Sequence, residues 1–161
     1  MNLHSGNRAN AAEVMYEVDS LYASTEIILG GRFREVPLDG LLLESCLLHF
    51  RIVWDFFHKP KKEATDLVAG DFVSGWKSDT PPPRLKAIRK WLNVMLAHLT
   101  THRTDPAYKV GEITSGDVQQ IREHTKVVFE TFARALSVEQ RKDFINPHAS
   151  KFARYETLKT A

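Results

Sequence analysis

The chain has 161 residues, 43% of them hydrophobic, and its 22 basic residues against 20 acidic ones leave a net charge of +2. This length suits a single domain, residues 1–161, whose one core needs no disulfide or metal for stability. A net charge this small does not by itself give the basic surface typical of a nucleic-acid-binding domain, and it leaves local basic patches open. The single cysteine, Cys46, lies in the most apolar stretch, which favours a buried thiol in a reduced, cytoplasmic protein. The N-terminus lacks a signal-peptide pattern and charges interrupt the longest apolar run, so we expect neither secretion nor a membrane span.

Two helices are expected in the first part of the chain. Apolar residues at helical spacing occupy residues 10–29, and the Gly30–Gly31 pair ends the pattern. A second helix is expected over residues 37–58, because a proline suits its first turn and Pro60 breaks it at the other end. The short connection between the two helices favours antiparallel neighbours.

Residues 59–83 form the longest interruption of the helical pattern. Five apolar residues make this segment too hydrophobic for a free linker: Leu67, Val68, Phe72, Val73 and Trp76. We expect it to pack over one end of the helices as a turn or a short helix.

Two long helices and one short helix are expected in the remainder. The third begins at the prolines after Thr80 and ends near Arg103, and the fourth runs from 114 to 136 behind a capping box of Thr114 and Asp117. A fifth, short helix is expected over residues 137–144. No alternating strand pattern competes. The sequence therefore predicts an all-α fold, a four-helix up-and-down bundle with a packed crossover loop and a short C-terminal helix.

The tail, residues 147–161, has little apolar periodicity. We expect it to be mobile or to dock on a partner.

The second helix carries four polar residues among apolar neighbours. Helical arithmetic puts Arg51, Asp55 and His58 on one face and points His49 almost oppositely. Burying ionisable groups costs free energy unless they are paired. Two interpretations follow: Arg51 and Asp55 form an ion pair within the helix and His49 is a satisfied core histidine, or these groups belong to a functional site.

The third helix supplies a second polar set, Asn93, His98, His102 and Arg103. Two histidines four residues apart can meet one metal or one substrate. A histidine near its working pKa moves a proton, and arginine stabilises a developing phosphate charge. We expect a polar, candidate catalytic site between the second and third helices, made of six residues: His49, Arg51, Asp55, Asn93, His98 and Arg103.

The segment from Arg51 to His58 resembles the motif of the HEPN family. These are small helical bundles whose nuclease members carry arginine, a polar residue, a gap of four to six residues and histidine. This chain has Ile52 at the polar position. In the third helix, Asn93 and His98 match the polar residue and the histidine, and a leucine stands in place of the arginine.

The HEPN resemblance implies RNA cleavage without a metal or other cofactor, usually by a homodimer, and a place in a toxin–antitoxin or defence system. It implies that His98 is the acid/base group. Arg51 or Arg103 would then face the scissile phosphate.

A second resemblance is to the DinB-like metal-binding bundles, whose ligands are one histidine on an early helix and two at four-residue spacing on a later helix, the last followed by arginine. His49, His98 and His102, followed by Arg103, are similar to that pattern. The resemblance implies that the three histidines hold a divalent metal such as zinc or nickel, with an open position that activates water or a thiol. The segment after Arg103 departs from the family, because it lacks the glycine–glutamine continuation.

A softer likeness is to small uncharacterised bacterial helical proteins that share a His-x-Arg-x-x-x-Asp-Phe helix and an Asn-x-x-x-x-His-Leu-Thr-x-x-Arg helix. This likeness implies no activity. It leaves a third interpretation, in which the polar residues form a buried network and the protein is a noncatalytic interaction module. Whether the chain is an enzyme stays open at this point, and the expected partners are RNA, another protein or a second copy of the chain.

Overall fold

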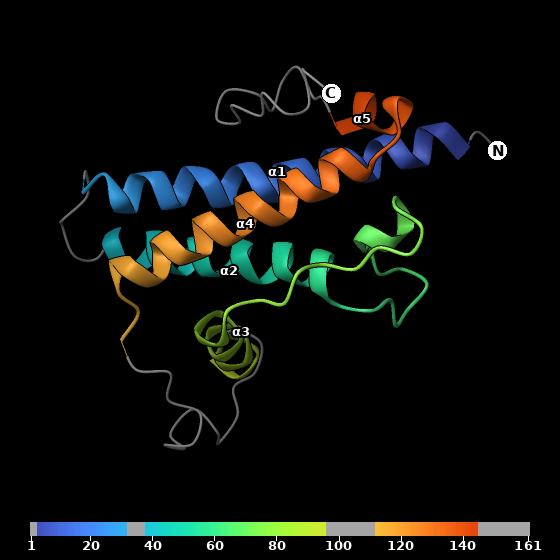
Figure 1. The fold of residues 1–161 in the computed structure, drawn as a ribbon. Helices are drawn as coiled ribbons and strands as arrows, with labels where there is room; N and C mark the ends of the chain where they lie inside the picture. The colour runs from blue at the N-terminus through green and yellow to red at the C-terminus, as the bar shows by residue number, and fades with distance from the viewer. Residues whose placement is uncertain (1–2, 32–37, 96–111, 145–161) are drawn as a thin grey trace.

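The computed structural model describes residues 3–31, 38–95 and 112–144, and these ranges contain helices, turns and loops but no strand (Figure 1). The elements in chain order are α1 (Leu3–Leu29), α2 (Leu38–His58), the 3₁₀ turn η1 (Ala69–Asp71), α3 (Pro83–Met95), α4 (Ser115–Ala135) and α5 (Val138–Phe144). The predicted all-α class is confirmed. None of the helices in these ranges is long and apolar enough to cross a bilayer.

The four long helices pack as a bundle. Figure 1 shows α2 running antiparallel to α1, with α4 also antiparallel to α1. The same view looks along the axis of α3, so this helix lies steeply across α2 and α4, both of which it contacts. The short α5 packs against α1. α2 and α4 each contact the other three long helices.

The crossover segment between α2 and α3 packs on the bundle, as predicted from its apolar residues. The indole Nε1 of Trp76 donates a hydrogen bond to the carbonyl oxygen of Phe57 at 2.9 Å. The ring centroid of Phe132 on α4 lies 6.2 Å from that of Phe72 and 5.5 Å from that of Trp76, and both pairs meet edge to face. Aromatic pairs of this kind add to the free energy of burial. The segment is therefore part of the core.

Capping residues set the starts of the last two helices where the sequence predicts them. The hydroxyl of Thr114 accepts from the Asp117 amide, and the Asp117 carboxylate accepts from the Thr114 amide. Ser137 and Gln140 exchange the equivalent pair of hydrogen bonds before α5. Both are capping boxes, which satisfy amides that a helix start leaves unpaired.

The helix bounds differ from the prediction at one end. α1 begins at Leu3, seven residues before the predicted start at 10, because a helix continues beyond the apolar periodicity on which the prediction rested. The predicted start at Pro37 and the predicted end near Arg103 lie outside the described residues. Cys46 is fully buried, as expected from its neighbours.

Candidate functional site

His49 lies at the interface of α1 and α2. Its Nδ1 is 2.7 Å from Oε2 of Glu17 on α1, and both side chains are largely shielded from solvent. The expected position of His49 between the second and third helices is therefore wrong: its side chain leaves α2 on the α1 side. The interpretation of His49 as a satisfied histidine agrees with this contact.

Asp55 connects α2 to α3. Its carboxylate accepts hydrogen bonds from Nε and Nη2 of Arg89, and its Oδ2 also accepts from Nζ of Lys59 at 2.7 Å. The expected ion pair between Arg51 and Asp55 within the helix is thus replaced by a pair between helices. Arg89 binds the carboxylate through Nε and Nη2, and its burial makes a carboxylate partner necessary.

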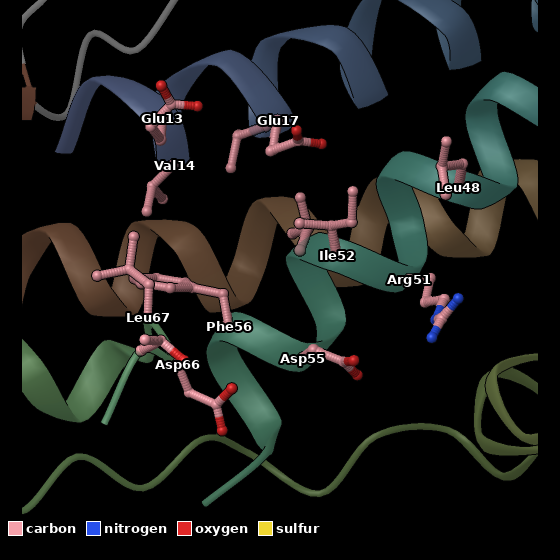
Figure 2. Close-up of a pocket in the computed structure, with 13 residues that line it drawn as sticks. Glu13, Val14, Glu17, Leu48, Arg51, Ile52, Asp55, Phe56, Asp66 and Leu67 are labelled. Atoms are coloured by element: carbon pink, nitrogen blue, oxygen red, sulfur yellow. The ribbon is translucent and has the colours of Figure 1, made fainter. Parts of the chain in front are cut away.

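Arg51 lines a groove between α1, α2 and the start of the crossover segment. The groove has a volume of about 420 Å³ and also receives Glu13, Glu17, Asp55 and Asp66. Figure 2 shows the two glutamates on one side, the two aspartates on the other, and Arg51 at one end. Glu17 contacts His49, and Asp55 pairs with Arg89 and Lys59, so Glu13 and Asp66 are the carboxylates that give the groove its acidic character.

The third-helix part of the predicted site is described only at Asn93, which is half-buried near the end of α3. His98, His102 and Arg103 lie outside the described residues, so the predicted metal set of His49, His98 and His102 is not tested. Within the described ranges, no group of three histidine, cysteine or acidic side chains could hold a metal ion.

A different polar cluster lies at the end of α2. His58 is 2.6 Å from the hydroxyl oxygen of Ser78 through Nδ1 and 3.2 Å from Nε2 of His124 through its own Nε2. The planes of the two imidazoles differ by 13° and their centroids are 5.2 Å apart. Since the centroids are farther apart than the nitrogens, the rings meet edge to edge through their Nε2 atoms. Trp54 packs beside both rings, with its centroid 4.5 Å from that of His58 and 6.0 Å from that of His124.

These contacts limit where the protons of the two imidazoles can lie. One Nε2 carries the proton and donates it to the other. If His58 is the Nε2 donor, its Nδ1 accepts from the Ser78 hydroxyl; if His124 is the donor, His58 Nδ1–H donates to the Ser78 oxygen. The cluster therefore has two neutral arrangements, which differ in the tautomer of both imidazoles and in whether the Ser78 hydroxyl donates to His58 Nδ1 or accepts from it.

Both imidazoles of the pair are held in the neutral form at pH 7. Burial, with smaller contributions from His124 and Lys86, lowers the pKa of His58 to about 4. Burial also lowers the pKa of His124, against the opposing charge of Asp79. The physical cause is that a desolvated imidazole loses the water that would stabilise its cation.

His58 and Ser78 open into a second pocket, of about 510 Å³, between the end of α2 and the crossover segment. Lys59, Lys61 and Lys77 line it together with one acidic residue, Asp71, which pairs with Lys61 at 2.8 Å. Lys59 pairs with Asp55 at 2.7 Å, whereas Lys77 has no ion-pair partner among the described residues, so the pocket keeps a basic character. We call it the His58 pocket.

Sequence reasoning missed Ser78, His124 and Arg89. None of the three belongs to a motif in its own segment, and the three segments are far apart in the chain. His58 is a polar residue on an apolar helix, but it lies outside the six-residue site that the sequence predicts. No periodic signal could have found these partners, because hydrogen bonds between segments leave no spacing in the sequence.

No protein-family model, curated protein or solved structure matches this chain.

Proposed function

We propose that this protein is an RNA-acting, HEPN-like helical bundle whose phosphate-binding and acid/base site is the His58 pocket. The observation that carries the proposal is the hydrogen-bonded chain of Ser78, His58 and His124 at the wall of a pocket that three lysines line. A concave site with convergent polar groups and histidines of shifted pKa is where chemistry is expected in a protein of unknown activity.

The charge of the lining residues favours the His58 pocket over the groove around Arg51 as the phosphate-binding site. A phosphodiester entering the groove around Arg51 would meet Glu13, Glu17 and Asp66. In the His58 pocket, it would meet lysine side chains, which bind phosphate as point charges. The proposal therefore moves the phosphate-facing cations from Arg51 to Lys59, Lys61 and Lys77, and keeps His58, the histidine of the Arg51–His58 motif.

The proposed reaction is an internal transesterification. The neutral imidazole pair takes the proton of a ribose 2′-hydroxyl, whose oxygen attacks the adjacent phosphorus, and the 5′-oxygen of the next nucleotide leaves. The pair then returns that proton to the leaving oxygen, so the products are a 2′,3′-cyclic phosphate and a 5′-hydroxyl. The proton enters at Nδ1 of His58 through the Ser78 hydroxyl, which passes its own proton on, because the two Nε2 atoms already share one hydrogen.

The direct test is cleavage of a single-stranded RNA oligonucleotide in the presence of a chelator. We expect cyclic-phosphate ends, and a loss of about 100-fold or more in rate for His58→Gln and His124→Gln. Lys142→Ala, which removes an exposed lysine of α5, is the matched control and should cleave normally. Both glutamine variants must melt cooperatively, and normal cleavage by either would overturn the proposal.

A His98→Ala variant in the same assay tests the acid/base role that the HEPN resemblance implies for that residue.

A second test measures binding rather than chemistry. Replacing the three pocket lysines by alanine should weaken RNA binding and make it less dependent on salt, because each lysine releases counterions from the phosphates. Undiminished binding by this variant would place RNA elsewhere on the protein.

Sedimentation equilibrium of the same preparations tests whether the protein is a homodimer. Growth of cells that express the wild type or His58→Gln tests toxicity.

The alternative function is a noncatalytic interaction module, and the contacts of His49 and Asp55 favour it. Each is engaged by a residue of another helix, Glu17 for His49 and Arg89 for Asp55. Paired in this way, both residues hold the helices in register. This alternative expects the His58 variants to retain every measurable activity.

A further inference from the structure

α2 leaves a stripe of apolar side chains exposed. Leu41, Leu48 and Ile52 are 61%, 44% and 39% exposed. Seven residues are close to two helical turns and four are slightly more than one, so these positions follow one another along a single side of α2. The stripe spans about three turns, a length that a short helix of another molecule can cover.

The stripe leads into the groove of about 420 Å³ between α1 and α2. Ile52 and Leu67 lie in the middle of this groove in Figure 2, with Phe56 beside Leu67. Carboxylates border the apolar middle on both sides. Glu17 contacts His49 and Asp55 contacts Arg89, so the edge carboxylates without an ion-pair partner among the described residues are Glu13 on α1 and Asp66 on the crossover segment. The groove is therefore an apolar strip between two acidic edges.

Charge and shape together specify what fits this surface. An amphipathic helix presents an apolar stripe at i, i+3, i+4 and i+7, and lysine or arginine beside that stripe would meet the acidic edges. A nucleic acid would be repelled by the same edges. We propose that this groove is a docking site for a basic amphipathic helix of a partner protein, with its apolar stripe on Leu48 and Ile52 and its cations beside Glu13 and Asp66.

The docking site is separate from the His58 pocket. The two sites share no lining residue: the groove uses the α1 side of α2 and residues 65–67, whereas the His58 pocket uses the end of α2 and other residues of the crossover segment. Its occupation does not depend on the RNA proposal, and the failure of one leaves the other intact.

The test uses fluorescence anisotropy with the full chain and a labelled helical peptide made only of leucine and lysine, with leucines at i, i+3, i+4 and i+7. We expect saturable binding that weakens about tenfold in the double variant Leu48→Ser, Ile52→Ser and to a similar degree in Glu13→Lys. The matched controls are Val127→Ser and Glu139→Lys, which change an exposed valine of α4 and an exposed glutamate of α5 and should bind as the wild type does. All four variants alter exposed side chains, so each is expected to fold.

Two further peptides test the chemistry of the occupant. A leucine–glutamate peptide of the same pattern should not bind, and a leucine–lysine peptide in scrambled order should bind at least tenfold more weakly. Equal binding of ordered and scrambled peptides, or equal losses in the groove and control variants, would overturn the proposal. So would a wild-type dimer in sedimentation equilibrium that dissociates in the double serine variant, because the occupant would then be a second copy of the chain.

Discussion

Arg89 of α3 donates hydrogen bonds to the carboxylate of Asp55 on α2 through two nitrogens. Nε lies 2.8 Å from Oδ1, and Nη2 lies 2.5 Å from Oδ1 and 2.6 Å from Oδ2. Only 4% of Arg89 is exposed, so its charge is taken out of water by the bundle. Its remaining nitrogen, Nη1, is buried without a hydrogen-bond partner among the described residues. A desolvated guanidinium needs its carboxylate, which makes this pair the polar link between α2 and the helix that crosses it.

Removal of Asp55 is expected to destabilise the protein much more than removal of its second partner. Asp55→Ala leaves Arg89 buried and unpaired, which costs about 3 kcal/mol in the free energy of unfolding. Lys59→Ala breaks only an exposed pair just beyond the end of α2, worth about 0.5 kcal/mol. Urea denaturation followed by circular dichroism measures both. Equal losses in the two variants would show that Arg89 finds another partner.

Asp19 on α1 should make the protein more stable as the pH falls below 7. Burial raises the pKa of this carboxyl to about 7, and neither oxygen has a hydrogen-bond partner among the described residues. The folded state thus binds a proton that the unfolded state releases above about pH 4, so stability declines between pH 4 and pH 7 as the pH rises.

The variant Asp19→Asn isolates this contribution. It should remove the decline and stabilise the protein at pH 8 by on the order of 2 kcal/mol, because no buried charge remains. Thermal melts of both proteins between pH 4 and pH 8 measure the difference. Parallel curves for the two proteins would contradict the raised pKa.

The neutral His58 imidazole should make the protein less stable as the pH falls, which is opposite to the effect of Asp19. Its pKa is lowered to about 4 by burial, so the unfolded state takes up a proton near pH 6.5 that the folded state refuses. The stability contributed by the neutral imidazole is present above pH 6.5 and is lost between pH 6.5 and pH 4. The His58→Gln variant should lose less stability than the wild type over that range, and NMR titration of the imidazole reads its pKa directly. An NMR pKa above 6 would be inconsistent with a buried, neutral pair.

Asp117 should contribute stability over almost the whole working range of pH. Arg84 donates two hydrogen bonds to its carboxylate, at 2.7 and 2.8 Å, and the Thr114 amide donates a third at 2.9 Å. These contacts, Arg84 first, hold the pKa of Asp117 well below its usual range despite burial. Its contribution is complete above about pH 4 and is lost only at lower pH.

Asp117→Ala removes a helix cap and an ion pair together, and we expect a loss of about 2 kcal/mol at pH 7. Gln119→Ala, two residues further along α4 on an exposed side, is the matched control and should change stability by less than about 0.5 kcal/mol. Chemical denaturation of the three proteins tests this. A loss in Asp117→Ala no larger than that of the control would contradict the role of the cap.

The secondary structure could be predicted from the sequence because its signals are local. Apolar residues at helical spacing indicate α2 and α4, the Thr114–Asp117 pair specifies where α4 begins, and Pro60 accounts for the end of α2. The packed crossover segment could be predicted from its apolar content alone. The burial of Cys46 followed from its apolar neighbours in the same way.

The sequence by itself thus determined an all-α chain of four long helices and a short one, and it singled out the polar residues of α2 as unusual. It could not determine their partners. Helical spacing gives the direction of a side chain about its own helix axis, but which helix lies in that direction depends on how the helices cross. Only the tertiary structure joins His49 to Glu17, Asp55 to Arg89 and His58 to both Ser78 and His124, because these contacts form between segments that packing alone brings together.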